Sequence, residues 1–283
     1  MGIIGAILGD IAGSKWEFAP MSEKRQDGTY ELFNEHNYFT DDTVLSIACK
    51  DAILKKKLFH KPDFVKAYDY WGNKYKDRGY GSSFLCWLDN DNKEPYNSYG
   101  NGSAMRCSYI GQYTTSLKQC DELAKLSAIC THNHPEGIKG AVVLAHCVWM
   151  AEHNDSKDNI LNYAIKQYMP VLSLEPYNIN FPKDGMINDR YIFSPANPTK
   201  FYKDEITYKI SCQGSVPVAI RCFYETNSFE ECMFLINSMC IDTDTVGAIA
   251  GAICESYYKK CMDNDEELLK RYLPEEMFQI IYS

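Results

Sequence analysis

Two short acidic sequences, far apart in the chain, carry the residues best suited to bind a metal ion. The first is Thr40-Asp41-Asp42-Thr43 and the second is Asp242-Thr243-Asp244-Thr245. Each stands directly before an apolar run with helical spacing, so each is expected to open a helix. Carboxylates and hydroxyls are the oxygen ligands that hard divalent cations prefer, and four acids at one place would repel unless a cation neutralised them. The two sequences therefore predict a divalent-metal site.

Either sequence taken alone also has a structural explanation. Threonine and aspartate are preferred at helix N-caps, and acidic residues in a first turn complement the helix dipole. For a single box the cap is the commoner explanation. The second box favours metal binding, because two helix starts that each offer carboxylates and hydroxyls can converge on one cation site.

A third acidic element lies near the N-terminus and contains Asp10 and Glu17. Asp10 is interpreted as a structural acid bonded to backbone donors. Glu17 follows Trp16 at the expected end of the first helix. Read together with the two acidic boxes, Glu17 is predicted to be functional.

A glycine-bearing loop, Gly100-Asn101-Gly102-Ser103, precedes an expected helix from Ala104 to Ile110. Such a helix start presents free backbone N–H groups to an anion such as a diphosphate. A Gly-Asn-Gly turn is also common without any ligand, so the loop alone indicates only a turn.

Two histidines, His132 and His134, follow an expected helix that ends at Cys130, where an imidazole can cap the helix C-terminus. Cys130 lies in the apolar pattern of that helix, so we expect it to be buried and inert rather than a thiol nucleophile. The other cysteines are scattered singly through apolar patterns and none forms a C-x-x-C pair, which indicates small buried side chains in a reducing compartment. A zinc site is not expected.

The elements that must position these residues are predicted to be helices. Apolar residues recur at helical spacing through most of the chain, alternating strand-like patterns are scarce, and the best of these is the short run Ile206–Ile210. The sequence predicts one all-α domain over residues 1–283, a compact helical bundle. From about Pro170 to Gln213 the helical pattern lapses, which indicates either a loop over the site or a variable insertion without a role.

The composition limits the partners. A net charge of −9 argues against a broad electrostatic contact with nucleic acid or with anionic membrane. No stretch approaches the roughly 18 uninterrupted apolar residues that a membrane span needs, and no signal peptide is evident. We expect a cytoplasmic protein whose partner is a small molecule or a modified protein.

These motifs, taken together and in order, resemble the ADP-ribosylglycohydrolase family, which includes dinitrogenase-reductase-activating glycohydrolases and hydrolases of ADP-ribosylarginine and ADP-ribosylserine. The matching segments are Gly5–Ser14 with Glu17, Phe39–Val44, Tyr99–Arg106, Thr131–Ala141, Ser215–Ile220 and Asp242–Thr245 with Ala250–Ile253. One departure is Cys240-Ile241, where many relatives carry Gly-Gly.

The resemblance implies a compact all-α fold that holds two Mg²⁺ or Mn²⁺ ions between the acidic boxes. The implied metal ligands are Thr40, Asp41, Asp42, Asp242, Asp244 and Thr245. The resemblance makes Glu17 the acid beside the metals that helps position or activate water. It also implies that the loop of Gly100, Asn101, Gly102 and Ser103, with His132, holds the ribose and diphosphate of ADP-ribose.

The implied function is hydrolysis of the bond between ADP-ribose and a modified protein or small conjugate, with Glu17 or Asp42 as proton acceptor. Arginine is the expected acceptor, because Trp16 and Phe18 flank Glu17 and an aromatic face can stack on a guanidinium. The alternative is that both aromatic residues belong to the core of the first helix. The alternatives are an O-linked substrate, namely ADP-ribosylserine or O-acetyl-ADP-ribose, and a non-catalytic ADP-ribose-binding protein.

Overall fold

The computed structural model describes residues 3–19, 31–55, 60–168 and 208–283. These residues form fourteen α-helices, one short 3₁₀ helix and no strand, so the predicted all-α fold is confirmed. In chain order the helices are α1 (Ile4–Gly13), η1 (Ser14–Trp16), α2 (Asp41–Leu54), α3 (Lys61–Lys74), α4 (Ser82–Asp89), α5 (Gly102–Met105), α6 (Ser108–Tyr113), α7 (Leu117–Ala128), α8 (Pro135–Glu152), α9 (Lys157–Tyr168), α11 (Cys212–Glu225), α12 (Phe229–Asn237), α13 (Thr243–Tyr258), α14 (Asp265–Tyr272) and α15 (Glu275–Ile281).

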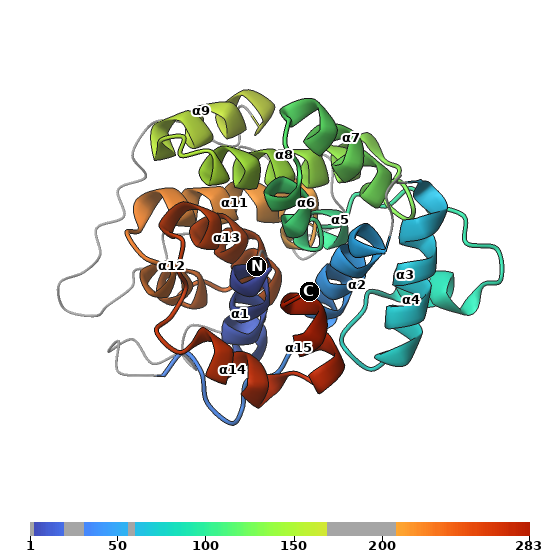
Figure 1. The fold of residues 1–283 in the computed structure, drawn as a ribbon, viewed down its shortest axis with the longest axis horizontal. Helices are drawn as coiled ribbons and strands as arrows, with labels where there is room; N and C mark the ends of the chain where they lie inside the picture. The colour runs from blue at the N-terminus through green and yellow to red at the C-terminus, as the bar shows by residue number, and fades with distance from the viewer. Residues whose placement is uncertain (1–2, 20–30, 56–59, 169–207) are drawn as a thin grey trace.

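Helices α1 and α13 form an antiparallel pair near the centre of the molecule (Figure 1). A Cβ atom placed on Gly5 would lie 2.1 Å from the Gly251 carbonyl oxygen, and one placed on Gly9 would lie 2.0 Å from the Gly247 carbonyl oxygen. The two backbones are therefore in direct contact, which only residues without a side chain allow. Because the glycines recur at every fourth residue, they line one face of each helix.

The C-terminal end of α1 is held by side chains from three other segments. Asn37, Asn237 and Thr243 donate hydrogen bonds to the carbonyl oxygens of the last three residues of α1, at 2.7, 3.0 and 2.8 Å. Carbonyls in the last turn of a helix lack the usual partner within it, and these bonds help to satisfy them. The end of α1, and the chain that follows it, are thereby fixed in place.

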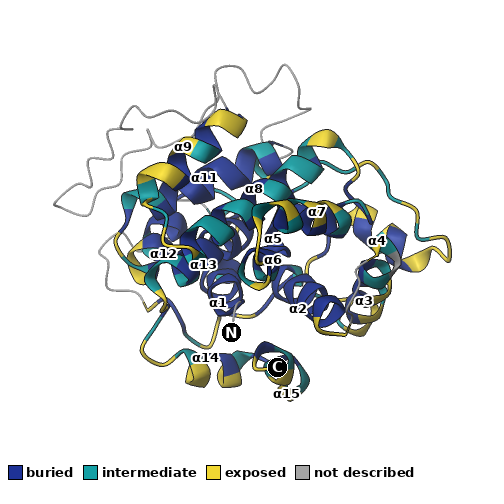
Figure 2. Cartoon of the chain, turned by 45° about the horizontal axis from the view of Figure 1, so that its top comes forward, coloured by how far each residue is buried: buried dark blue, intermediate teal, exposed yellow. Residues whose placement is uncertain are grey.

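The remaining helices surround this central pair. Helix α2 packs on α1 and α3, while α11 and α12 pack on α13. Helix α8 packs on α13 and carries α7, α6 and α9 on its other sides (Figure 1). Figure 2 shows the result as burial: α1, α2 and α13 are almost wholly buried, whereas α9, α14 and α15 each expose one side. No helix in the described part of the chain is long and apolar enough to span a membrane.

One local prediction was wrong. The helix expected from Ala104 to Ile110 is divided between α5 and α6, and the thiol of Cys107 donates to the carbonyl oxygens of Ala104 and Ala141 at the break. This turn allows Arg106 to be fully buried.

The strand-like pattern at Ile206–Ile210 lies partly outside the described residues, which begin again at position 208, and the residues from 208 to 210 form no strand. Asn101 N donates to the Ile210 carbonyl at 2.9 Å and Cys212 N donates to the Tyr99 carbonyl at 3.0 Å, around an isolated bridge between Gly100 and Ser211. Of the segment Pro170–Gln213, residues 169–207 lie outside the described residues, and Cys212 begins α11.

The contact between α1 and α13 predicts that Gly9→Ala destabilises the protein. The added methyl group would collide with backbone, so we expect a loss of roughly 1–3 kcal/mol in the free energy of unfolding, the usual cost of overpacking. Alanine has the higher helix propensity, so a loss cannot come from propensity. Urea denaturation measures the effect. Gly81→Ala is the control, because a Cβ atom there would meet nothing within 4 Å, and equal stability of the two variants would contradict the prediction.

Candidate active site

A cavity of about 630 Å³ lies where the chain after α1 meets the first turns of α2 and α13. Every site residue that the sequence predicted, except Ser103, lines it. These residues are Glu17, Thr40, Asp41, Asp42, Gly100, Asn101, Gly102, His132, Asp242, Asp244 and Thr245. The fold therefore brings together residues from five separate segments.

The first acidic box opens α2 and is held by Asp10. Thr40 is the N-cap, and its hydroxyl accepts from the Asp42 amide at 3.3 Å. The buried Asp10 carboxylate accepts hydrogen bonds from the backbone amides of Thr40 and Thr43, at 3.0 and 3.1 Å, and from both hydroxyls. Asp10 thus caps α2 from another helix, and its predicted structural role is confirmed.

The second acidic box opens α13 and bonds directly to the first. Asp242 is the N-cap residue, and the Thr245 hydroxyl donates to Asp42 Oδ2 at 3.1 Å. The side-chain amide of Asn101 donates to Asp242 Oδ2 at 2.7 Å and to the Ser215 hydroxyl at 2.9 Å. Both amide protons are then used, so Asn101 orients an acid of the cluster.

Glu17 reaches the cavity through a turn in which Phe18 has a positive φ of 48°. A non-glycine residue in this region is uncommon and is held there by its surroundings. Here the Phe18 amide donates to the Ile241 carbonyl at 2.9 Å, which ties the turn to the residue just before the second box. Unlike the buried Asp242 and Asp244, Glu17 is solvent-exposed.

Burial raises the pKa of each carboxyl group in the cluster, and repulsion by neighbouring carboxylates adds to the rise for Glu17, Asp41, Asp42 and Asp244. For Glu17 the causes are burial, then the charges of Asp242 and Asp10, and the pKa rises to about 7. For Asp10 burial raises the pKa to about 6, although the hydrogen bonds it accepts oppose the rise. The pKa also rises, with burial as the largest cause, for Asp41, Asp42, Asp242 and Asp244.

The cluster fits a hard cation. One carboxylate oxygen from each of Glu17, Asp242 and Asp244 lies within 4.8 Å of the other two. The buried Oδ1 atoms of Asp42 and Asp244 have no hydrogen-bond partner. Buried acceptors without a donor are costly, and a divalent cation would satisfy them.

The glycine loop and His132 form another wall of the cavity. A Cβ atom on Gly100 or Gly102 would lie 3.5 or 3.3 Å from His132 Nε2, so the imidazole sits against the bare backbone of the loop. Burial and the charge of Arg106 keep the pKa of His132 well below its ordinary value. Ser103 differs from the prediction: it is fully buried, its hydroxyl donates to the Gly137 carbonyl at 2.7 Å, and it does not face the cavity.

Several lining residues were not singled out from the sequence. They are Tyr38, Arg78, Gly79, Gly81, Ser82, Ser83, Tyr96, Ser98 and Arg106, among others. The run from Gly79 to Ser83 leads into α4, whose N-terminus has no side-chain cap. Glycines before a helix are the signal that identified the Gly100 loop, so this second loop could have been found in the same way.

The remaining predictions near the site have different outcomes. Trp16 and Phe18 flank Glu17 but do not line the cavity, and Lys15 Nζ already lies 4.8 Å from the Trp16 ring. His134 does not close the preceding helix; its Nδ1 accepts from the Glu136 amide at 3.1 Å as the N-cap of α8. Its structural role is confirmed, at a different helix end.

The expected burial of the cysteines is confirmed for ten of the twelve; Cys86 and Cys240 are exposed, and all twelve are free. Cys130 is among the buried ones, and burial raises the pKa of its thiol to about 12. A thiol with so high a pKa is a poor nucleophile, as its sequence position predicted.

Comparison with known proteins identifies relatives over most of the chain. The family model for ADP-ribosylglycohydrolases matches residues 1–259. The ADP-ribosylhydrolase ARH3 sequences of Mus musculus and Homo sapiens are each 27% identical to the chain, over 90% of its length and 82% and 84% of theirs. A solved structure titled ADP-ribosylglycohydrolase-related protein complex has a TM-score of 0.70 at 20% identity, covering 98% of this chain and 93% of that one, so it shares the fold.

The raised pKa values predict how the metal-free protein responds to pH. Glu17 binds a proton more tightly in the folded chain, with a pKa near 7 against an ordinary value of 4.5. Its contribution to stability is complete below pH 4.5 and is lost as the pH rises through about 7. The buried aspartates act in the same direction. We expect the Tm of EDTA-treated protein to fall between pH 5.5 and 8.

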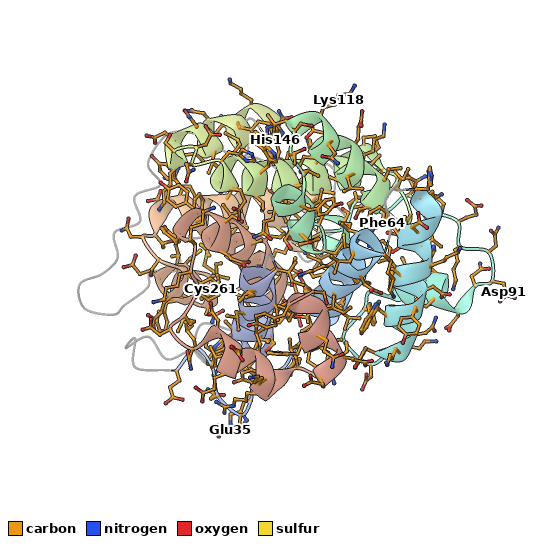
Figure 3. All side chains as sticks on the ribbon, in the orientation of Figure 1. Glu35, Phe64, Asp91, Lys118, His146 and Cys261 are labelled. Carbon is orange, nitrogen blue, oxygen red and sulfur yellow. The ribbon has the colours of Figure 1, made fainter. Side chains whose placement is uncertain are left out.

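Asp244→Asn tests the cause of that fall, because it removes one repelling charge and keeps the shape of the side chain. The variant should have the higher Tm in EDTA at pH 8 and should gain less stability from Mg²⁺ than the unmodified protein. Asp91→Asn, at an exposed site on the periphery in Figure 3, is the matched control and should change neither value. A lower Tm for Asp244→Asn in EDTA at pH 8 would refute the repulsion argument.

Proposed function

Because the chain belongs to the ADP-ribosylglycohydrolase family and is a glycosidic-bond hydrolase, we propose that its cavity binds an ADP-ribosyl group and releases it from a modified acceptor with the help of divalent metal ions. The observation that carries the proposal is the meeting of both acidic boxes and Glu17 at one cavity. In the reaction the bond from the anomeric carbon of ribose to the acceptor breaks and water supplies the new oxygen.

The proposed cofactor is a pair of Mg²⁺ or Mn²⁺ ions, held by Thr40, Asp41, Asp42, Asp242, Asp244 and Thr245. Such ions, when bound, orient ribose hydroxyls and lower the pKa of a coordinated water. The unpartnered buried oxygens of Asp42 and Asp244 support this role for the two boxes. All six proposed ligand positions keep oxygen-bearing side chains, which argues against a non-catalytic ADP-ribose-binding protein.

Between the two candidates for the proton acceptor, the contacts favour Glu17. Asp42 is buried, and its Oδ2 is engaged by the hydroxyls of Thr40 and Thr245. Glu17 is exposed at the cavity, so its carboxylate can take a proton from water and exchange it with solvent. We assign Asp42 to holding the metal and Glu17 to general base catalysis.

The charges around the cavity suggest how the ligand lies in it. The acidic boxes suit the ribose hydroxyls once cations are bound. The lining also includes Arg78, the start of α4, which has no side-chain cap, and His132 with Arg106. Backbone amides at a helix start and guanidinium groups attract anions, so we place the diphosphate toward these groups.

For the linkage, we favour an O-linked substrate, ADP-ribosylserine or O-acetyl-ADP-ribose, over ADP-ribosylarginine. The arginine hypothesis needed an aromatic face for a guanidinium beside Glu17. Neither Trp16 nor Phe18 lines the cavity. The Lys15 ammonium group already lies over the Trp16 ring, where a guanidinium would have to stack. Arg78 on the cavity wall would also repel a guanidinium. The free cysteines are consistent with a reducing compartment, so we propose a cytoplasmic location.

Removal of metal tests the cofactor. We expect release of ADP-ribose to stop after EDTA treatment and metal-free dialysis and to return with Mg²⁺ or Mn²⁺. Asp42→Ala should abolish turnover while the protein stays folded and helical by circular dichroism. If the acidic boxes were only helix caps, the change would cost about 1 kcal/mol of stability and spare catalysis. Turnover that survives metal removal unchanged would rule out the metal-assisted reaction.

Substrate comparison tests the linkage. We expect faster release of ADP-ribose from serine-linked or O-acetyl substrates than from an arginine-linked one at matched concentrations. Trp16→Ala should change the three rates by the same factor, because its ring is not offered to the acceptor. Dominant cleavage of the arginine linkage, lost selectively in Trp16→Ala, would reverse the assignment and leave the hydrolase function intact.

A further inference from the structure

A fully buried arginine, Arg106, lines the cavity together with His132. Arg106 is fully buried, and its Nη2 donates to the Ser127 carbonyl and to the Thr131 hydroxyl, both at 2.9 Å. Its guanidinium carbon lies 4.2 Å from the centre of the Tyr68 ring. Among the described residues no carboxylate forms a salt bridge with Arg106, and its Nε and Nη1 have no hydrogen-bond partner. A buried charge without a counterion is expensive, so its effect on neighbouring groups must be considered.

The Thr131 hydroxyl connects this charge to His132. Its Oγ1 accepts from Arg106 and lies 2.7 Å from His132 Nδ1. A hydroxyl has two acceptor positions and a single proton. Because Arg106 donates to the oxygen, the hydroxyl proton is free to point to His132 Nδ1, 2.7 Å away.

Electrostatics decides against the reverse arrangement, in which Nδ1 would carry the proton and Thr131 would accept it. A neutral imidazole has a dipole whose negative end is the bare nitrogen. A bare Nδ1 faces the positive guanidinium favourably, whereas an Nδ1–H group would be repelled by it. The same charge, together with burial, disfavours a doubly protonated imidazolium.

The other ring nitrogen, Nε2, is the one turned toward the cavity. It lies beside Gly100 and Gly102, and His132 lines the cavity wall. If Nδ1 accepts a proton from Thr131, the proton of the neutral ring must be on Nε2. The cavity then receives a hydrogen-bond donor in a fixed position.

We infer that Arg106, acting through the Thr131 hydroxyl, is a positioning residue that holds His132 as a neutral imidazole protonated at Nε2. The donor is matched to an oxygen acceptor on the ligand, and in the proposed function, on which this identification of the ligand rests, the acceptor is a phosphoryl oxygen of ADP-ribose. The protonation of the ring does not depend on turnover.

The direct test is nuclear magnetic resonance of the full-length protein with ¹⁵N-labelled histidine. Correlation of the ring nitrogens with the ring carbon-bound protons shows which nitrogen carries the proton. The chain has six histidines, and the signal of His132 is assigned with His132→Gln. We expect a neutral ring with the proton on Nε2 from pH 6 to 8. A proton on Nδ1, or an imidazolium in that range, would overturn the inference without any further variant.

Variants of Thr131 test the relay. Thr131→Val keeps the shape and removes the hydroxyl, so the Nδ1–H form should appear, and the Kd for ADP-ribose measured by calorimetry should rise about tenfold. Thr131→Ser restores the hydroxyl and should restore both values. Thr114→Val is the control, because its buried hydroxyl donates to the Ile110 carbonyl and lies away from the cavity. An unchanged proton position in Thr131→Val would contradict the relay.

The outcomes separate this inference from the proposed function. If the ring behaves as expected and ADP-ribose binds, but no linked substrate is cleaved, the hydrolase assignment fails and the relay stands. If the substrates are cleaved and the proton lies on Nδ1, the relay alone fails.

Discussion

The direct backbone contact between α1 and α13 is the constraint on which the site depends. Glycines at every fourth position allow the two helices to touch without side chains between them. In an antiparallel pair this contact sets the end of α1 beside the start of α13. Glu17 and Asp10 are thereby brought next to Asp242 and Asp244, although more than two hundred residues separate them in the chain. The hydrogen bonds from Asn37, Asn237 and Thr243 then fix the end of α1.

This arrangement places several carboxylates in one site, where burial and mutual repulsion disfavour their charged forms. Asp10 is satisfied by four donors, and Asp242 and Asp42 each accept from a neighbouring side chain. The second oxygens of Asp42 and Asp244 remain without a partner. Buried polar atoms without a partner lower the stability of a protein. They are expected at functional sites, where the stability of the rest of the fold offsets their cost. The large apolar core around α1, α2, α8 and α13 supplies that stability (Figure 2).

The cavity lining combines acidic and basic groups, and both kinds include buried side chains. Asp242 and Asp244 of the second acidic box are buried, and so is Arg106, whose charge, together with burial, lowers the pKa of His132. A ligand that combines hydroxyl groups with a diphosphate matches such a cavity better than a ligand of one charge sign. The position of the single proton on the neutral imidazole of His132 follows from the same buried charge.

The sequence by itself determined the helical fold, the position of both acidic boxes at helix starts and the structural role of Asp10, because apolar spacing and helix capping are local properties of the chain. It also indicated correctly that nearly all the predicted residues would meet at one cavity. Tertiary structure alone decided that the Ser103 hydroxyl donates to the Gly137 carbonyl and that the Asn101 amide donates to Asp242. The direction in which a side chain points depends on which helices pack against it, and those partners come from distant parts of the chain.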